Sequence, residues 1–346
     1  MPSVREMASM VMNGAAGASA YLAVGADVNQ SRGIAAAIVN TAAGDVGINS
    51  GADKGWDALE SAMFATPRVA LAASSIASAG FVHTTDILKQ LTVTQEQAAG
   101  AASILADVDC DIAVLDLAKT DYGYSILGAG SIAFPAGVPT PVWQSSRMGP
   151  PVDGGLGATT VAMGADVGAD AAACVMLCTE RGALAASGLS GFGVTHTTDI
   201  AKLITSCREA AVGGASIRAD IAFDYLILGL VPGTGDPSLE LHGWCAITGG
   251  VGAAFLAQTG HFNTIVRVGA GIYDLTLGAD QGADANASAI ICTPRQVMAP
   301  SGMRSIAVAH TDDLVKRITC LQETGGGAAS AAADFNFDVG VVRQLI

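Results

Sequence analysis

Residues 196–205 read HTTDIAKLIT, residues 83–92 read HTTDILKQLT, and residues 310–319 read HTDDLVKRIT. The histidines of these three stretches are separated by steps of 113 and 114 residues. Other residue types follow the same steps along the chain: Glu96, Glu209 and Glu323; Ser103, Ser216 and Ser330; Asp107, Asp220 and Asp334; Asp111, Asp224 and Asp338. So many positions in register indicate three copies of one unit.

The spacing predicts three globular domains with the limits 1–115, 116–228 and 229–346. Each is close to the commonest size of a protein domain, and the step is far longer than the roughly 20–50 residues of solenoid repeats. The fronts of the units, up to about residue 50, from 116 to 163 and from 229 to 277, share little beyond glycine, proline and short apolar runs.

The backs of the units carry the signals of β-strands. Residues 91–94 read LTVT, an alternation of apolar and β-branched residues that favours a strand. Glycine-rich breaks at 213–216 and 325–328 predict hairpin connections. Residues 333–339 read ADFNFDV, which places phenylalanine and valine on one face and aspartate and asparagine on the other. We therefore expect a mostly-β protein of three tandem, homologous β-sandwich or jelly-roll-like domains with a pseudo-threefold relationship. An α/β fold is the alternative, supported by the alanine-rich residues 32–43.

The composition limits the classes of partner that the protein could have. Only 14% of the residues are charged while 51% are hydrophobic, so we expect neighbouring subunits to cover much of the surface. The net charge of −14 and the absence of a basic run argue against nucleic acid and against an acidic membrane surface as partners. No apolar stretch approaches the ~18 residues of a spanning helix. The first residues lack a clean targeting signal, because Glu6 and Asn13 interrupt the apolar run.

Seven cysteines do not follow the repeat. An odd, irregular set predicts reduced, buried thiols rather than a disulfide framework.

A Gly-Ala-Asp-x-Gly-x-Asp turn opens the back of each unit and offers two carboxylates four residues apart. A hard cation such as Ca²⁺ takes oxygen ligands from aspartate-rich loops, whereas ordinary turn chemistry is the competing interpretation. The candidate metal ligands are Asp53, Asp57, Asp166, Asp170, Asp280 and Asp284. No other cofactor is expected.

The repeated His-Thr-x-Asp set could supply a general base with its orienting group. We favour a structural interpretation, in which these side chains satisfy backbone groups at the turn into a strand. Three equivalent histidines meeting on an axis would instead form a trigonal metal site. The series Asp107, Asp109 and Asp111 is expected to be the solvated side of a strand.

The repeated pairs Ser103 with Lys89, Ser216 with Lys202 and Ser330 with Lys316 suggest an enzymatic alternative. Three Ser–Lys pairs in a chain of this length are similar in plan to the cyanuric acid hydrolase and barbiturase family. That resemblance implies a pseudo-threefold amidohydrolase that opens a cyclic imide. The chain lacks the family's serine-glycine motifs, and no nucleophile elbow is present.

The His-Thr turn, the threonine-rich strand and the hairpin into ADFNFDV resemble β-sandwich units of tailed-phage virions, of the decoration, tail and head-fibre types. The resemblance covers the back half of each unit. It implies a non-enzymatic structural protein of a virion, folded in the host cytoplasm, whose partners are copies of itself and other virion subunits. A receptor- or glycan-binding module is a further alternative, weakened because only 5% of the residues are aromatic and Trp56, Trp143 and Trp244 do not repeat.

Overall fold

The computed structural model describes residues 4–13, 18–22, 37–42, 44–49, 61–67, 76–85, 88–96, 103–106, 108, 110–116, 126–145, 147–164, 174–182, 184, 189–209, 214–229, 239–258, 262–278, 288–298, 302–312, 314–323 and 330–344. Among these residues, no helix combines the length and the apolar character that a bilayer crossing requires.

The described chain consists almost entirely of β-strands, which confirms the mostly-β fold class. The one helical element within it is a 3-10 turn at Pro135–Gly137. The first third contains β1 (Val4–Asn13), β2 (Ala18–Leu22), β3 (Ala37–Ala42), β4 (Asp45–Asn49), β5 (Ser61–Pro67), β6 (Ala77–His83), β7 (Leu88–Glu96), β8 (Ser103–Leu105) and β9 (Cys110–Asp116). The second contains β10 (Ile126–Ala133), β11 (Thr140–Gln144), β12 (Val152–Asp153), β13 (Ala158–Ala162), β14 (Cys174–Glu180), β15 (Ser190–His196), β16 (Ala201–Glu209), β17 (Ser216–Arg218) and β18 (Phe223–Gly229). The third contains β19 (Leu239–Thr248), β20 (Ala254–Gln258), β21 (Phe262–Gly269), β22 (Ile272–Leu277), β23 (Ser288–Pro294), β24 (Arg304–His310), β25 (Val315–Glu323), β26 (Ser330–Ala332) and β27 (Phe337–Gln344).

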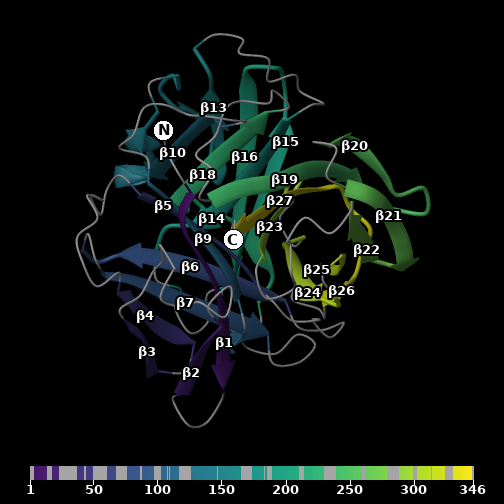
Figure 1. Ribbon diagram of the computed structural model, residues 1–346. Helices are drawn as coiled ribbons and strands as arrows, with labels where there is room; N and C mark the ends of the chain where they lie inside the picture. The colour runs from purple at the N-terminus through teal and green to yellow at the C-terminus, as the bar shows by residue number, and fades with distance from the viewer. Residues whose placement is uncertain are drawn as a thin grey trace.

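Each third, called a unit from here on, repeats the same two antiparallel strand arrangements (Figure 1). The first sheet has the order β2-β1-β9-β5 in unit 1, β11-β10-β18-β14 in unit 2 and β20-β19-β27-β23 in unit 3. The second has the order β3-β4-β7-β6, β12-β13-β16-β15 and β21-β22-β25-β24, with β8, β17 and β26 paired to β7, β16 and β25. A parallel bridge between Glu180 and Gly80 joins the first sheet of unit 2 to the second sheet of unit 1. The domain limits 1–115, 116–228 and 229–346 remain a prediction.

Both sheets of a unit contribute to one apolar core. In unit 3 the core combines Phe337 and Val339 of β27 with Tyr273 of β22 and Val308 of β24. The Tyr273 and Phe337 rings lie 5.4 Å apart between centroids. The apolar face expected for residues 333–339 is therefore the core face of this unit, and the two sheets form a sandwich.

The opposite face of that strand differs from expectation. Asp111 was expected to face water, yet it is 0% exposed, and so is Asp338 at the equivalent position of unit 3. The alternation itself is right, but Asp111 and Asp338 are covered by another unit rather than by solvent. Period-two patterning identifies the two faces of a strand and does not identify what covers the polar one.

The His-Thr stretch forms the expected turn between two strands. Thr85 and Thr198 accept hydrogen bonds from the backbone N–H groups of Leu88 and Ala201 through their side-chain oxygens. Asp312 takes this role in unit 3, where its Oδ1 atom accepts from the Val315 N–H group. The strands expected after the turn are β7, β16 and β25. These hydrogen bonds confirm that the second residue after each histidine satisfies backbone groups of the turn. The histidines do not share this role, because their Nε2 atoms contact aspartate side chains.

The fronts of the units share more than the sequence suggested. Gly44, Gly157 and Gly271 occupy equivalent places with φ of 68°, 64° and 63°. A Cβ atom there would lie 2.5–2.6 Å from the carbonyl oxygen of Val93, Ser206 or Cys320. Glycine is therefore required at each place, both by the left-handed backbone and by the close approach of a strand.

The three units contact one another pairwise and so close into a ring, whose centre is called the axis from here on. Strands β5, β14 and β23, one from each unit, contact one another pairwise, and so do β6, β15 and β24. These two sets of strands lie where the units meet.

Candidate functional site

The three repeated histidines each contact an aspartate of another unit. The Nε2–Oδ2 distance is 3.2 Å for His83 with Asp224, 3.0 Å for His196 with Asp338 and 2.7 Å for His310 with Asp111. All six side chains are at most 2% exposed. Unit 1 therefore reaches unit 2, unit 2 reaches unit 3, and unit 3 returns to unit 1.

Each aspartate accepts further hydrogen bonds at the same interface. Asp338 accepts from the backbone N–H of Met176 at 2.9 Å and from Arg295 Nη1 at 2.9 Å. Arg295 Nη1 also donates to the carbonyl oxygen of Cys174, so it bridges units 2 and 3. The equivalent bonds are Met63 N and Arg181 Nη1 to Asp224, and Ile290 N to Asp111. The carboxylate is the centre of each interface.

The protonation states follow from this geometry. Burial disfavours the charged form of Asp338, but the hydrogen bond and charge of His196, with the charge of Arg295, lower its pKa below 3.8. Burial likewise lowers the pKa of His196 below 6.5, against the opposing effect of Asp338. The histidine is therefore neutral at neutral pH, and its Nε2–H group donates to the carboxylate. Asp224 and His83 shift in the same directions for the same reasons.

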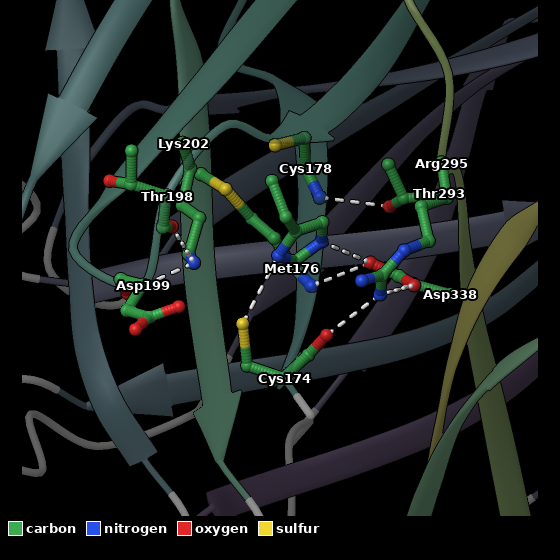
Figure 2. A network of polar contacts seen from close by, with 10 residues as sticks. Cys174, Met176, Cys178, Thr198, Asp199, Lys202, Thr293, Arg295 and Asp338 are labelled. Atoms are coloured by element: carbon green, nitrogen blue, oxygen red, sulfur yellow. Dashed lines mark hydrogen bonds and ion pairs between the residues drawn. The ribbon is translucent and has the colours of Figure 1, made fainter. Parts of the chain in front are cut away.

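The interface between units 2 and 3 adds a cysteine (Figure 2). Cys174 Sγ lies 3.1 Å from His196 Nδ1, and His196 Nε2 contacts Asp338. The three side chains are thus connected in the same order as the nucleophile, base and orienting group of a Cys–His–Asp triad. Burial raises the pKa of the Cys174 thiol, although the charge of Lys202 opposes the shift. A thiol that stays protonated donates to Nδ1 and is a poor nucleophile. Cys174 therefore adds a hydrogen bond to this interface.

The repeated serines and lysines have separate partners. The serine hydroxyls donate to buried glutamates of another unit, from Ser103 to Glu209 at 2.6 Å, from Ser216 to Glu323, and from Ser330 to Glu96 at 3.0 Å. The lysine Nζ atoms donate to carbonyl oxygens of their own turns, from Lys89 to Thr85, from Lys202 to Thr198 and from Lys316 to Asp312. These bonds give both residue types a structural role, at a unit contact and at a turn.

A third set of contacts surrounds the axis. Backbone N–H groups donate to threonine Oγ1 atoms of another unit, from Ala65 to Thr179 at 3.3 Å, from Cys178 to Thr293 at 3.0 Å, and from Cys292 to Thr66 at 3.0 Å. The Cys178 bond is visible in Figure 2. Together the histidine, serine and threonine contacts run in one sense around a closed ring.

The axis carries a cavity of about 70 Å³. Six equivalent positions from each unit line it: Ala65, Thr66, Pro67, Ala77, Ser78 and Ala79; Cys178, Thr179, Glu180, Ser190, Gly191 and Phe192; Cys292, Thr293, Pro294, Arg304, Ser305 and Ile306. Equivalent positions of the three units therefore line the cavity, but these positions carry different residue types.

Two charged residues break the symmetry of this axial cavity. Glu180 stands where the other units have Pro67 and Pro294, and Arg304 stands where they have alanine or serine. Glu180 accepts a hydrogen bond from Ser190 Oγ and pairs with Arg208 at 2.8 Å. Burial raises its pKa, and these two partners oppose the shift. The sequence offered no signal for Glu180 and Arg304 beyond their departure from the repeat.

The candidate cation ligands lie outside the described residues; they are Asp53, Asp57, Asp166, Asp170, Asp280 and Asp284. Within the described part of the chain, no three His, Cys, Asp or Glu side chains gather as a metal site would require. The hypothesis of a trigonal histidine site is wrong, because the three histidines occupy three different interfaces. All seven cysteines are free and buried, which confirms that prediction.

Comparison of the chain with protein-family models, with curated proteins and with solved structures gave no match.

Proposed function

We propose that this chain is a non-enzymatic structural protein of a large assembly, and more specifically a component of a phage virion of the capsid decoration, tail or fibre type. The observation that carries the proposal is that the repeated polar residues form hydrogen bonds between units. The repeated histidines and serines, which looked most like catalytic groups, are bonded to aspartates and glutamates of other units in a closed ring. Three fused copies would suit a position of local threefold symmetry on a shell or fibre.

A contact surface for neighbouring subunits is available on unit 3. The strand β21 is an edge strand of its sheet, and Val266 and Val268 on it are each 54% exposed. Leu256 on β20, which contacts β21, is 44% exposed. A long edge strand with exposed apolar side chains favours pairing with another chain. In unit 2 the equivalent edge strand β12 has only two residues, Val152 and Asp153.

The enzymatic alternative requires a serine activated by a lysine. Ser216 instead donates to Glu323, and Lys202 donates to the turn carbonyls of Thr198 and Asp199. These contacts favour the structural proposal over a Ser–Lys amidohydrolase.

Light scattering of the purified chain near neutral pH tests the proposal. We expect particles several times heavier than the 34.5 kDa chain, and we expect Val266→Lys with Val268→Lys to reduce that mass, because a charged edge opposes pairing. The matched control is Val138→Lys, which replaces a valine 56% exposed outside the strands and should leave the mass unchanged.

A monomer at every concentration would contradict self-assembly through this edge. Hydrolysis of a cyclic amide that Lys202→Met abolishes would contradict the non-enzymatic assignment.

A further inference from the structure

The three interfaces of the ring differ in how the chain connects the units that meet there. Units 1 and 2 are consecutive in sequence, as are units 2 and 3, whereas units 3 and 1 lie at the two ends of the chain. A direct chain connection keeps two separated units at a high effective concentration and so favours their contact. The interface between units 3 and 1 lacks such a connection, so units separated there regain the most conformational freedom.

At each of the two consecutive interfaces, a short segment crosses from one unit onto the unit before it. In unit 2 the segment follows β14, and the Leu184 N–H group donates to Thr92 Oγ1 of unit 1 at 2.9 Å. In unit 3 the segment follows β23, and the Met298 N–H group donates to Thr205 Oγ1 of unit 2 at 2.8 Å. These bonds add to the histidine, serine and threonine contacts of the two interfaces.

A glycine three residues before the repeated histidine permits each crossing. A Cβ atom on Gly80 would lie 2.6 Å from the carbonyl oxygen of Gly182, and one on Gly193 would lie 2.1 Å from that of Gln296. Unit 3 has Ala307 at this place, buried in an apolar cluster. Because its Cβ atom occupies the space that the two glycines leave open, a backbone crossing as close as the other two is excluded over unit 3.

The interface between units 3 and 1 also contains an unsatisfied polar atom. His310 Nδ1 is buried and has no hydrogen-bond partner among the described residues. At the equivalent place in unit 2, Cys174 Sγ lies 3.1 Å from His196 Nδ1. Unit 3 has Ser288 in the position of Cys174. A buried polar atom without a partner destabilises the closed state, because it loses its hydrogen bonds to water and gains none.

We propose that the ring opens at the interface between units 3 and 1 while the other two interfaces stay closed. Opening there separates β23 from β5, which contact each other and are edge strands of their sheets. An uncovered edge strand can pair with another chain. This use in assembly rests on the proposed function, whereas the opening itself does not, so each can fail without the other.

Hydrogen exchange of the full chain near neutral pH tests the opening, because amide exchange reports local separation of packed elements. Each interface holds two equivalent backbone N–H groups that are bonded across it: Met63 and Ala65, Met176 and Cys178, and Ile290 and Cys292. After correction for intrinsic rates, we expect Ile290 and Cys292 to exchange about tenfold faster than the other four, because one unsatisfied buried atom accounts for such a ratio.

Two reciprocal substitutions are the matched controls. Ser288→Cys gives unit 3 the thiol of unit 2 and should slow the exchange of Ile290 without changing that of Met176. Cys174→Ser should speed the exchange of Met176 without changing that of Ile290. Equal exchange at the three interfaces, or fastest exchange at Met63 or Met176, would overturn the proposal, as would unchanged exchange of Ile290 in Ser288→Cys. The wild-type comparison needs no variant, so it remains decisive where a substituted chain does not fold.

Discussion

The interface between units 2 and 3 and the interface between units 3 and 1 use the same histidine–aspartate contact with different surroundings. His196 uses both ring nitrogens, Nε2 toward Asp338 and Nδ1 toward Cys174. His310 makes the shorter contact to Asp111, but its Nδ1 atom is buried and has no hydrogen-bond partner among the described residues. The position of Cys174 is occupied by serine in the other units.

The comparison distinguishes a contact of histidine Nε2 that all three interfaces share from a contact of Nδ1 that differs between them. The Nε2 contact to a buried carboxylate occurs at all three interfaces, and in each the carboxylate also accepts a backbone N–H group. The Nδ1 contact is made at one of the two interfaces compared. The aspartate therefore defines the joint between units, and the cysteine adds to it locally.

Removing the central carboxylate should produce the largest effect. We expect Asp338→Ala to lower the free energy of unfolding by about 3–5 kcal/mol, because it leaves Arg295 buried without its counter-ion. Asp111→Ala should also destabilise the other interface, because the Ile290 N–H group and His310 lose their acceptor. Chemical denaturation of the full chain measures both.

The control for this experiment is Asp274→Ala, which breaks the half-exposed pair with Arg317. A surface pair is worth about 1 kcal/mol or less. If Asp338→Ala costs no more than Asp274→Ala, the carboxylate does not define the joint.

Removing the cysteine should produce a smaller effect that is confined to one interface. Cys174→Ala leaves His196 Nδ1 buried without a donor, which costs about 1–3 kcal/mol. Cys174→Ser retains a donor and makes this position the same as in the other units, so it should cost less than the alanine variant. Denaturation of the two variants side by side checks this order. Equal losses in both would mean that the volume of the sulfur, and not its hydrogen bond, is what matters.

The pH dependence gives the smallest and most specific effect. The folded-state pKa values of His83 and His196 lie below 6.5, so the unfolded chain takes up protons first as the pH falls. Stability from these residues is present above pH 6.5 and is lost as the pH falls through the window between 6.5 and the folded-state pKa. His196→Gln should flatten this part of the stability profile.

Stability measured against pH for the wild type, His196→Gln and His310→Gln would sharpen the comparison of the two interfaces. A profile unchanged by His196→Gln would show that this histidine does not contribute to the acid sensitivity. A second loss is expected at lower pH, because the pKa values of Asp224 and Asp338 lie below 3.8 in the folded state. Glu180 acts in the opposite sense, since its raised pKa makes the folded state bind more protons above pH 4.5.

Much of the local structure could be predicted from the sequence. The β-branched alternation of residues 91–94 is part of β7, and the Thr85 and Thr198 side chains cap the turns that precede β7 and β16. These features depend on neighbours within a few residues, which the sequence shows directly. The solvated face expected for Asp111 was wrong because its cover comes from a distant part of the chain.

The sequence by itself determined the threefold repeat, the β-strands and the residue types that recur at each joint. Only the tertiary structure decided which copy meets which. His83 lies nearer in sequence to Asp111 but bonds Asp224, a partner 141 residues away, and His310 closes the ring on Asp111 across 199 residues. Within a repeat, a contact inside one unit and a contact between units leave the same sequence pattern, because every copy carries both partners. The axial cavity has the same origin, since its lining comes from all three units.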